Sequence, residues 1–140
     1  MATPQHITLE IVTPDHAVVH AEVDEVQLPG REGYFGVLPG HTPFLAMLDV
    51  GQMWYRRGQE KTFLAVGFGF AEVLPDRVIV LARVAEKAEE IDVARAEAAM
   101  RRAEQRMARP GVDLDWERAR VAMMKAITRL QVASRHRTRG

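Results

Sequence analysis

The sequence predicts an α+β protein, in which an N-terminal antiparallel β-sandwich is followed by a C-terminal antiparallel hairpin of two helices. Two observations lead to this prediction. Short runs from Ile7 to about Val84 alternate hydrophobic and polar residues, as strands with one buried face do. From Asp92 onward the hydrophobic period becomes three to four residues, which is typical of a helix packed on a partner. We expect a sandwich domain over residues 1–84, a linker over 85–91 and a hairpin over 92–140.

The first strand places Ile7, Leu9 and Ile11 on one face and ends near Pro14. Further strands are expected at residues 17–23, 26–28, 44–48, 52–56, 62–66, 68–74 and 78–84. Glycine, proline and aspartate punctuate these runs, and no helical pattern separates them. Many short strands joined by turns predict an antiparallel sandwich or barrel.

A glycine-rich segment at residues 30–41 invites comparison with a phosphate-binding loop. It lacks the Gly-Lys-Ser or Gly-Lys-Thr ending, and no helical pattern follows it. We therefore expect a structural or partner-contacting loop. Gly67-Phe68-Gly69 lacks the third glycine of a dinucleotide fingerprint and is expected to be a bulge or a close packing point.

The two helices are predicted from hydrophobic residues at alternating spacings of three and four. Asp92 is the expected N-cap of the first helix, Arg109-Pro110-Gly111 its end, and Asp115 the cap of the second. The first packing seam comprises Val93, Ala96, Met100, Ala103 and Met107, and the second comprises Trp116, Ala119, Met123, Ala126, Leu130 and Ala133. A short connection between two such seams predicts an antiparallel helical hairpin.

Alanine occupies alternate positions in both seams, so the hairpin buries little apolar area. At about 25 cal/mol per Å², a small buried area gives limited stability. One hypothesis is that the hairpin opens or leaves the sandwich when a ligand shifts the equilibrium. The alternative is a hairpin packed permanently on the sandwich.

The formal net charge of zero hides two oppositely charged halves. Residues 1 to 91 hold 7 Lys and Arg against 13 Asp and Glu, a charge of −6, whereas residues 92 to 140 hold 12 against 6, a charge of +6. The basic half either is simply well solvated or meets an acidic partner. The sequence has no cysteine, no signal segment and no run of roughly 20 apolar residues. A cytoplasmic protein is expected.

No catalytic or metal-binding pattern emerges from the sequence. His16 and His20 lie in a turn and a strand, where a spacing of four does not build a ligand pair. Ser134 is the single serine and lacks a nearby base. Within the hairpin, Arg118, Lys125 and Arg129 share a helix face. They either bind an anion or serve solubility.

Three segments of the sequence resemble the epsilon subunits of bacterial F-type rotary ATP synthases. They are GYFGVLPGHTP at residues 33–43, IDVARA at residues 91–96, and Arg129 with Leu130. Their order and spacing cover essentially the whole chain. The resemblance implies a non-catalytic central-stalk subunit, peripheral at the cytoplasmic face of the bacterial inner membrane and bound there only through the complex.

The resemblance also implies the partners. The sandwich would bind the gamma subunit and the c-ring, with Arg31, Glu32, Tyr34 and His41 at the c-ring contact. The hairpin would move between a compact state and an extended state that inhibits ATP hydrolysis by the alpha and beta catalytic subunits. Its beta-subunit contact would use Arg118, Arg120, Lys125 and Arg129.

No cofactor is required by this resemblance, but a regulatory ATP is implied because some relatives bind ATP in the compact hairpin. That site would comprise Glu86, Ile91, Asp92, Arg95, Ala96, Arg102, Arg118, Lys125 and Arg129. Tight-binding relatives have arginine in place of Lys125, so weaker binding is expected. The alternative function is a free-standing nucleotide sensor with the same fold. A nucleic-acid-binding module is disfavoured because the basic helices lack interleaved aromatic residues.

Overall fold

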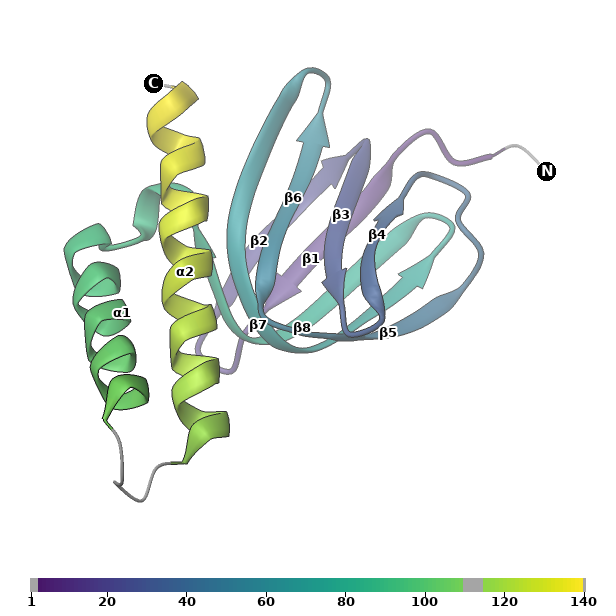
Figure 1. The fold of residues 1–140 in the computed structure, drawn as a ribbon. Coiled ribbons are helices and arrows are strands. Elements are labelled where there is room, and N and C mark those ends of the chain that lie inside the picture. Colours follow the sequence, from purple (N-terminus) through teal and green to yellow (C-terminus); the bar gives the residue numbers. More distant parts are fainter. Residues whose placement is uncertain (1–2, 110–114, 140) are drawn as a thin grey trace.

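The computed structural model describes residues 3–109 and 115–139, with the backbone alone for residues 137–139. It has a β-sandwich followed by a pair of helices, which confirms the predicted fold class (Figure 1). The elements in chain order are β1 (Ile7–Val12), β2 (Ala17–Val23), β3 (Glu25–Gly30), β4 (Gly33–Val37), β5 (Phe44–Leu48), β6 (Gly51–Arg57), β7 (Glu60–Leu74), β8 (Arg77–Lys87), the 3-10 helix η1 (Ala88–Glu90), α1 (Val93–Ala108) and α2 (Trp116–Arg139).

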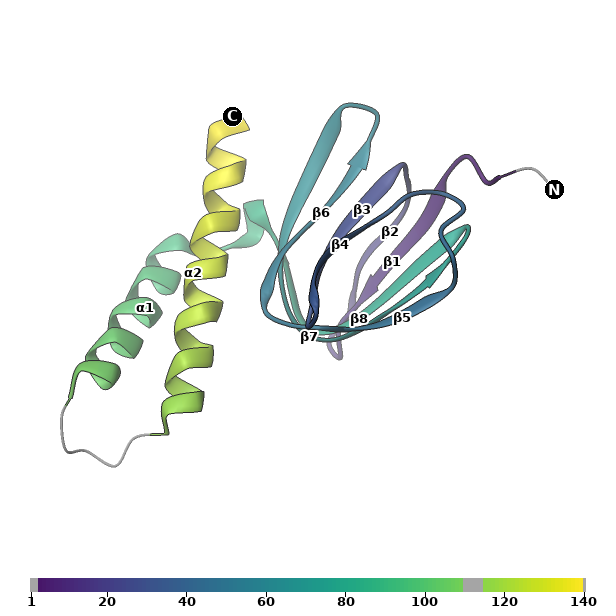
Figure 2. The ribbon, with the colours of Figure 1, turned by 45° about the vertical axis from the view of Figure 1, so that its right-hand side comes forward.

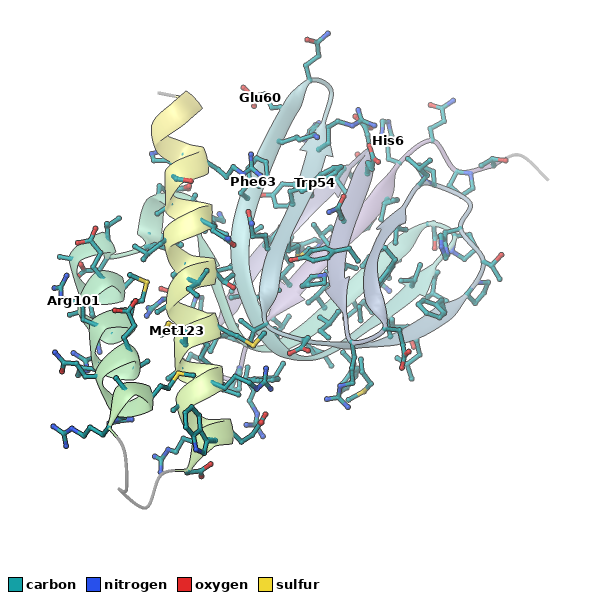
Figure 3. The ribbon with its side chains drawn as sticks, in the orientation of Figure 1. His6, Trp54, Glu60, Phe63, Arg101 and Met123 are labelled. Carbon is teal, nitrogen blue, oxygen red and sulfur yellow. The ribbon has the colours of Figure 1, made fainter. Side chains whose placement is uncertain are left out.

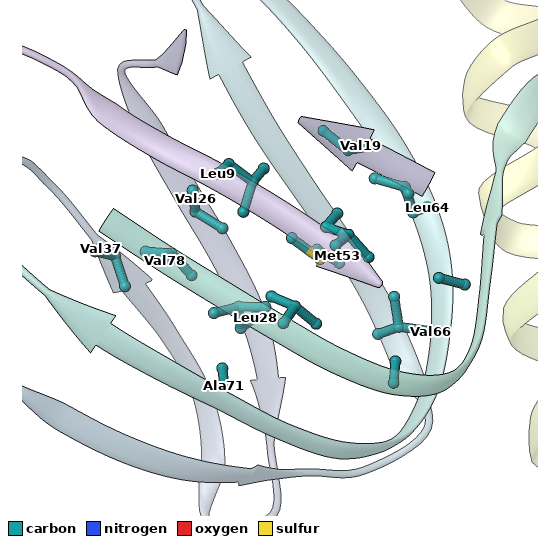
Figure 4. Close-up of a cluster of buried hydrophobic side chains, with 14 of the residues drawn as sticks. Leu9, Val19, Val26, Leu28, Val37, Met53, Leu64, Val66, Ala71 and Val78 are labelled. Carbon is teal, nitrogen blue, oxygen red and sulfur yellow. The ribbon is translucent and has the colours of Figure 1, made fainter. Parts of the chain in front are cut away.

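The core of the sandwich consists of aliphatic side chains on the inward faces of the strands (Figure 4). In β1, Ile7, Leu9 and Ile11 are buried while Thr8 and Glu10 are partly exposed, as the predicted alternation requires. Leu28 in β3 and Val78 in β8 reach the same core from the strands around it. The hydrophobic pattern of the sequence therefore identifies the core correctly.

The strands pair in the order β2-β1-β8-β7-β5-β3-β4, and β6 pairs with both β3 and β7. The pairs are antiparallel apart from β1 and β8, which run parallel with Thr8 opposite Arg77. The sheet is thus mixed, whereas the sequence predicts only antiparallel pairs. Alternation specifies which face of a strand is buried, but it does not specify the direction of a neighbour from a distant part of the chain.

Strand β7 replaces two predicted strands. It bends where Phe68 adopts a φ of 55° and Gly69 a φ of 129°. Before the bend it pairs with β6, and after it with β5. A Cβ atom at Gly69 would collide with the carbonyl oxygen of Leu81, which confirms the predicted close packing point.

The glycine-rich segment contains a strand that the sequence analysis missed. Residues 33–37 form β4, which pairs with β3 across a turn at Arg31 and Glu32. Gly33 has a φ of 131° at this turn, a value that favours glycine. Val37 is buried and Phe35 half-buried, so the segment alternates like a strand despite its glycines. The prediction of a loop over residues 30–41 is wrong for Gly30 and residues 33–37, which are strand, and correct for residues 31–32 and 38–41.

The last strand runs three residues beyond its predicted end at Val84. Ala85 and Glu86 pair with Val66 and Ala65 of β7, and η1 follows immediately. Most of the predicted linker over residues 85–91 is therefore regular structure. Glu86 is consequently fixed on a strand of the sandwich.

The helical hairpin has the predicted caps. The Asp92 carboxylate accepts a hydrogen bond from the backbone N–H of Arg95 at 3.1 Å, and Asp115 accepts one from Arg118 at 3.0 Å. The seam alanines Ala96, Ala103, Ala119, Ala126 and Ala133 are buried. Trp116 is 57% exposed, so its assignment to the seam is wrong.

Helix α2 lies between α1 and the sandwich in both ribbon views (Figures 1 and 2). The first helix ends at Ala108, close to the expected stop. Pro110 and Gly111 of that stop lie outside the described residues. Because α2 makes the contact with the sandwich, its inward face determines how firmly the hairpin is held.

Candidate regulatory interface between the hairpin and the sandwich

Helix α2 packs on a small apolar patch at one end of the sandwich. Ala65 of β7, Ala88 of η1 and Ile91 meet Val132 and Ala133 of α2 in a cluster separate from the sandwich core. Three of these five side chains are single methyl groups. Burial of such small side chains contributes little free energy, so the patch alone holds the hairpin weakly.

A salt bridge with two hydrogen bonds crosses this contact. Arg129 of α2 donates from Nε to one Glu86 oxygen at 2.7 Å and from Nη2 to the other at 3.0 Å. Both side chains are less than a third exposed. Two parallel charge-assisted hydrogen bonds fix the orientation of the arginine, so this pair sets the register of α2 against β8.

A cavity of about 220 Å³ lies beside the bridge, between α2 and the bend of β7. Lys125 extends toward this space, with its ammonium 5.6 Å from the ring centre of Phe68. The lining comprises Val50, Ala65, Val66, Gly67, Val84, Glu86, Lys125, Thr128 and Arg129. Two cations at an apolar cavity suit an anion with an uncharged portion, provided that Arg129 turns from Glu86 toward it.

Two further contacts of α2 were missed by the sequence analysis. The side-chain amide of Gln52 on β6 donates to Gln131 at 3.1 Å. The Arg135 guanidinium lies 5.3 Å from the ring centre of Phe63 on β7. Gln131 and Arg135 lie four residues apart on one side of α2, and this spacing is the signal that could have found them.

The implied ATP site is only partly assembled in the structure. Glu86, Lys125 and Arg129 line one cavity. Ile91 belongs to the apolar patch, Ala96 is buried in α1, and the Asp92 carboxylate caps that helix. Arg95 and Arg102 are exposed on α1, and Arg118 is exposed near the start of α2. The structure therefore brings together three of the nine residues.

The four residues of the implied beta-subunit contact do not share one environment. Arg118, Arg120 and Lys125 are exposed, whereas Arg129 is turned toward Glu86. Arg120 donates to Glu117 within α2 at 2.6 Å. This hydrogen bond raises the pKa of Arg120 and lowers the pKa of Glu117. The docked hairpin thus presents Arg118, Arg120 and Lys125 to solvent and retains Arg129.

The four residues of the implied c-ring contact lie at two ends of β4. Arg31 and Glu32 form the exposed turn before it, and Tyr34 is 57% exposed. The Tyr34 hydroxyl accepts a hydrogen bond from the backbone N–H of Gln52 at 3.1 Å. His41 follows the far end of the strand, where its Nδ1 lies 2.6 Å from the carbonyl oxygen of Thr42. These residues do not form one compact cluster.

An exposed apolar row crosses the outer face of the sandwich. Met47, Phe70 and Leu81 lie opposite one another on β5, β7 and β8. They are 49%, 41% and 40% exposed, and Leu45 beside them is 66% exposed. Contiguous exposed apolar surface of this kind is common at contacts between proteins.

Among the described residues, no helix is long and apolar enough to cross a bilayer. Within the same ranges, no three His, Cys, Asp or Glu side chains gather as a potential metal site.

Two family descriptions match successive parts of the chain. The description "ATP synthase, Delta/Epsilon chain, beta-sandwich domain" matches residues 6–88, and "ATP synthase, Delta/Epsilon chain, long alpha-helix domain" matches residues 89–134. The chain belongs to the ATP synthase delta/epsilon family. It is therefore a non-catalytic, central-stalk subunit of an F-type ATP synthase rather than an enzyme by itself.

Individual relatives agree with this membership. The chain is 51% identical to the ATP synthase epsilon chain of Syntrophobacter fumaroxidans over 131 residues, which cover 94% of this chain and 98% of the relative. It is 45% identical to that of Solibacter usitatus over 132 residues, with 94% and 98% covered. Its fold is similar to a chain of the Euglena gracilis mitochondrial ATP synthase, with a TM-score of 0.82, 23% identity, and 96% and 84% of the two chains covered.

Proposed function

We propose that the sandwich couples the catalytic head to the rotor by binding the gamma subunit and the c-ring, and that the hairpin inhibits ATP hydrolysis when it leaves the sandwich. The subunit is then peripheral at the cytoplasmic face of the bacterial inner membrane, held there through the complex. The observation that carries the regulatory part is the Glu86–Arg129 bridge, since it joins the hairpin to the sandwich across a patch of small side chains.

The attachment to the rotor is supported by the outer face of the sandwich. The row of Met47, Phe70 and Leu81 offers apolar area to the gamma subunit. The exposed turn at Arg31 and Glu32 offers charged groups to the c-ring. Because these two surfaces belong to the sandwich, the hairpin can move without disturbing them.

The inhibitory contact is supported by charge. Residues 92 to 140 hold 12 Lys and Arg against 6 Asp and Glu, which favours an acidic segment of a catalytic beta subunit. When the hairpin leaves the sandwich, Arg129 loses Glu86 and adds its charge to the exposed cations of α2, Arg118, Arg120 and Lys125. Release from the sandwich thus increases the positive charge that the hairpin can present.

The two cations beside the bridge, Lys125 and Arg129, support a regulatory ATP site there. The phosphates of ATP would engage Lys125 and Arg129, and its uncharged portion would face Val50 and Val84. ATP bound to the docked hairpin alone shifts the equilibrium toward that state. Lys125 provides charge without the arginine fork, so binding is weaker than in relatives with arginine there.

Cross-linking tests the inhibitory role. The chain has no cysteine, so Gln52→Cys and Gln131→Cys together place two unique thiols on either side of the contact, to be joined by a short bismaleimide. In the reconstituted complex, ATP hydrolysis should be inhibited before cross-linking and should rise afterwards. Gln131→Cys alone, given the same reagent, is the control. Equal rates before and after cross-linking would refute the inhibitory role.

ATP titration into the chain tests the sensor, with amide exchange in α2 as the readout. Exchange should slow on ATP addition, and Lys125→Arg should bind about tenfold more tightly because it restores the forked donor. Arg95→Ala reports whether the site extends to α1. If ATP changes exchange in no variant, the sensor is excluded while the coupling role stands.

A further inference from the structure

Phe68 has an unusual backbone conformation at the bend of β7. Within residues 3–109 and 115–139, it is the one residue other than glycine with a positive φ, at 55°. A bulky L residue is strained in this left-handed region because its Cβ atom approaches the backbone, whereas glycine is not. Glycine occupies both neighbouring positions, Gly67 and Gly69, yet the strained position itself carries a phenylalanine. Strain of this kind persists where the surrounding structure enforces it and is concentrated at functional positions.

The bend at Phe68 changes which side chains of β7 face the sandwich core. Before the bend, Leu64 and Val66 belong to the core, and after it Ala71 and Val73 do, so the inward positions change from even to odd numbers. Side chains of a regular strand alternate with a period of two, and this change of phase therefore requires an irregular residue, as in a β-bulge. The register between the described strands β7 and β8 accordingly has no pair at Phe68. The fold thus requires an irregular residue here, but it does not require an aromatic one.

The Phe68 ring meets helix α2 at Lys125. Strand β7 runs beside this helix before the bend, where Phe63 packs on the hairpin contact (Figure 3). At the bend, the Lys125 ammonium lies 5.6 Å from the centre of the Phe68 ring, within the distance of about 6 Å at which the face of an aromatic ring attracts a cation. No ion pair among the residues that the structure describes involves Lys125. The ring is therefore the group that the sandwich offers to this lysine.

Lys125 and Arg129 lie one helical turn apart and contact different strands of the sandwich. Arg129 donates to Glu86 of β8, and Lys125 lies at the Phe68 ring of β7. Residues at positions i and i+4 share one face of a helix. Two contacts from that face to adjacent strands restrict rotation of α2 about its axis more than the Glu86 contact alone does.

We propose that Phe68 is a positioning residue for Lys125, and that the strained bend serves to bring its ring to the docked hairpin. The strain lies within β7, so it is present whether or not the hairpin is docked. The contact with Lys125 forms in the docked state alone. Phe68 therefore lowers the stability of the sandwich while it stabilises the docked hairpin, and the second effect rests on the proposed mobility of the hairpin.

Phe68→Gly separates the two effects, since glycine adopts a φ of 55° without strain and has no ring. In amide exchange of the full chain, the slowest amides of β1 report the stability of the sandwich, and those of α2 report docking. The variant should slow exchange in β1 about fivefold, because strain is relieved, and accelerate it in α2 about threefold, because the ring is lost. Exchange in β1 that is no slower than in wild type would overturn the strained bend.

Phe70→Gly is the matched control, because it makes the same substitution in the same strand. Phe70 is paired with Met47 on one side and with Leu81 on the other, so it lies in a regular part of β7. Glycine is unfavourable in the interior of a regular strand. Exchange in β1 should therefore accelerate in this variant, whereas exchange in α2 should stay at the wild-type rate. Slower exchange in β1 in both variants would show that the effect is not specific to the bend.

A double-mutant cycle tests the contact between Phe68 and Lys125. Lys125→Gln removes the charge and retains the strain, so it should accelerate exchange in α2 about threefold and leave β1 unchanged. If the two residues act through one contact, the double variant should accelerate α2 no further than Phe68→Gly alone. Arg118→Gln removes an exposed charge from the same helix and should leave exchange in α2 unchanged. Multiplied effects in the double variant, or wild-type exchange in Lys125→Gln, would overturn the contact.

ATP hydrolysis by the reconstituted complex separates this inference from the proposed function. Phe68→Gly should lower the hydrolysis rate, since it favours release of the hairpin. If cross-linking between positions 52 and 131 relieves inhibition but Phe68→Gly leaves exchange in α2 unchanged, the role of Phe68 is wrong and the proposed function stands. If Phe68→Gly accelerates exchange in α2 but neither the variant nor cross-linking changes hydrolysis, Phe68 positions the hairpin and the inhibitory role fails.

Discussion

The interior of the sandwich and the contact that holds the hairpin are both apolar, but they are built from side chains of different size. Ile7, Leu9 and Leu28 are fully buried in the sandwich, and each buries several methyl or methylene groups. At the contact, Ala65 and Ala133 bury one methyl group each. Since burial free energy follows apolar area, the apolar contact holds the hairpin less firmly than the core holds the sandwich together.

The contact between the hairpin and the sandwich also includes two polar pairs. Around the hairpin contact, the Glu86–Arg129 bridge and the Gln52–Gln131 hydrogen bond contribute to docking. All four of these groups keep partial access to solvent, so water can replace their partners on release. The combination of small apolar side chains with solvent-accessible polar pairs is suited to a contact that forms and breaks.

Truncation of the sandwich core should have the largest effect. Leu9→Ala removes three side-chain carbon atoms from a position with 0% exposure and should lower the free energy of unfolding by about 2–5 kcal/mol. Urea denaturation followed by circular dichroism measures this. The control, Leu45→Ala, lies at a position 66% exposed and should change stability by less than about 0.5 kcal/mol. Similar losses in both variants would contradict the contrast between core and surface.

Loss of the ionic bridge should release the hairpin without weakening the sandwich. Glu86→Gln leaves Arg129 half-buried without its carboxylate, which disfavours the docked state. Amide exchange in α2 should accelerate about tenfold, while exchange in β1 and β8 stays unchanged. Glu89→Gln removes an exposed carboxylate from η1 and serves as the control. Equal acceleration in the strands would show that the two parts unfold together.

Local patterns in the sequence predict most of the fold because each element has a clear period or cap. Alternation identifies β1, and the caps Asp92 and Asp115 identify the helix starts. The sequence analysis fails where tertiary contacts override local preference. Strand β4 was missed because its glycines are typical of loops, although it pairs with β3. The two strands predicted on either side of Gly67 are one bent strand, β7, in which Gly69 packs closely against Leu81.

The candidate site is less predictable because it joins distant segments. Helical spacing groups Arg118, Lys125 and Arg129, but only Lys125 and Arg129 reach the cavity. Their partner Glu86 lies 43 positions before Arg129, and no local pattern links the two. The resemblance to epsilon subunits proposes Glu86, whereas its contact with Arg129 requires the folded arrangement of β8 and α2.

Replacement of a surface carboxylate of the sandwich, Asp24, should have the smallest effect on stability. That effect should be restricted to the sandwich domain. The Asp24 carboxylate accepts a hydrogen bond from the Gly58 backbone N–H at 2.7 Å, and His6 Nδ1 lies 3.0 Å away. The hydrogen bond from Gly58, and after it the one with His6, lowers the pKa of Asp24 below its usual 3.8. The folded state therefore favours the ionised form, so the contribution to stability is present above pH 3.8 and is lost as the pH falls through the lowered pKa.

Asp24→Asn should accordingly lower the Tm slightly at pH 7, and the difference from wild type should shrink as the pH falls below 3.8. Thermal denaturation of both proteins across this pH range measures the effect. Asp76→Asn, at an exposed turn between β7 and β8, controls for the loss of a carboxylate. Because Asp24, His6 and Gly58 all belong to the sandwich domain, amide exchange in α2 should stay unchanged at pH 7. Faster exchange there would show that the sandwich and the hairpin are coupled more tightly than their contrasting interfaces indicate.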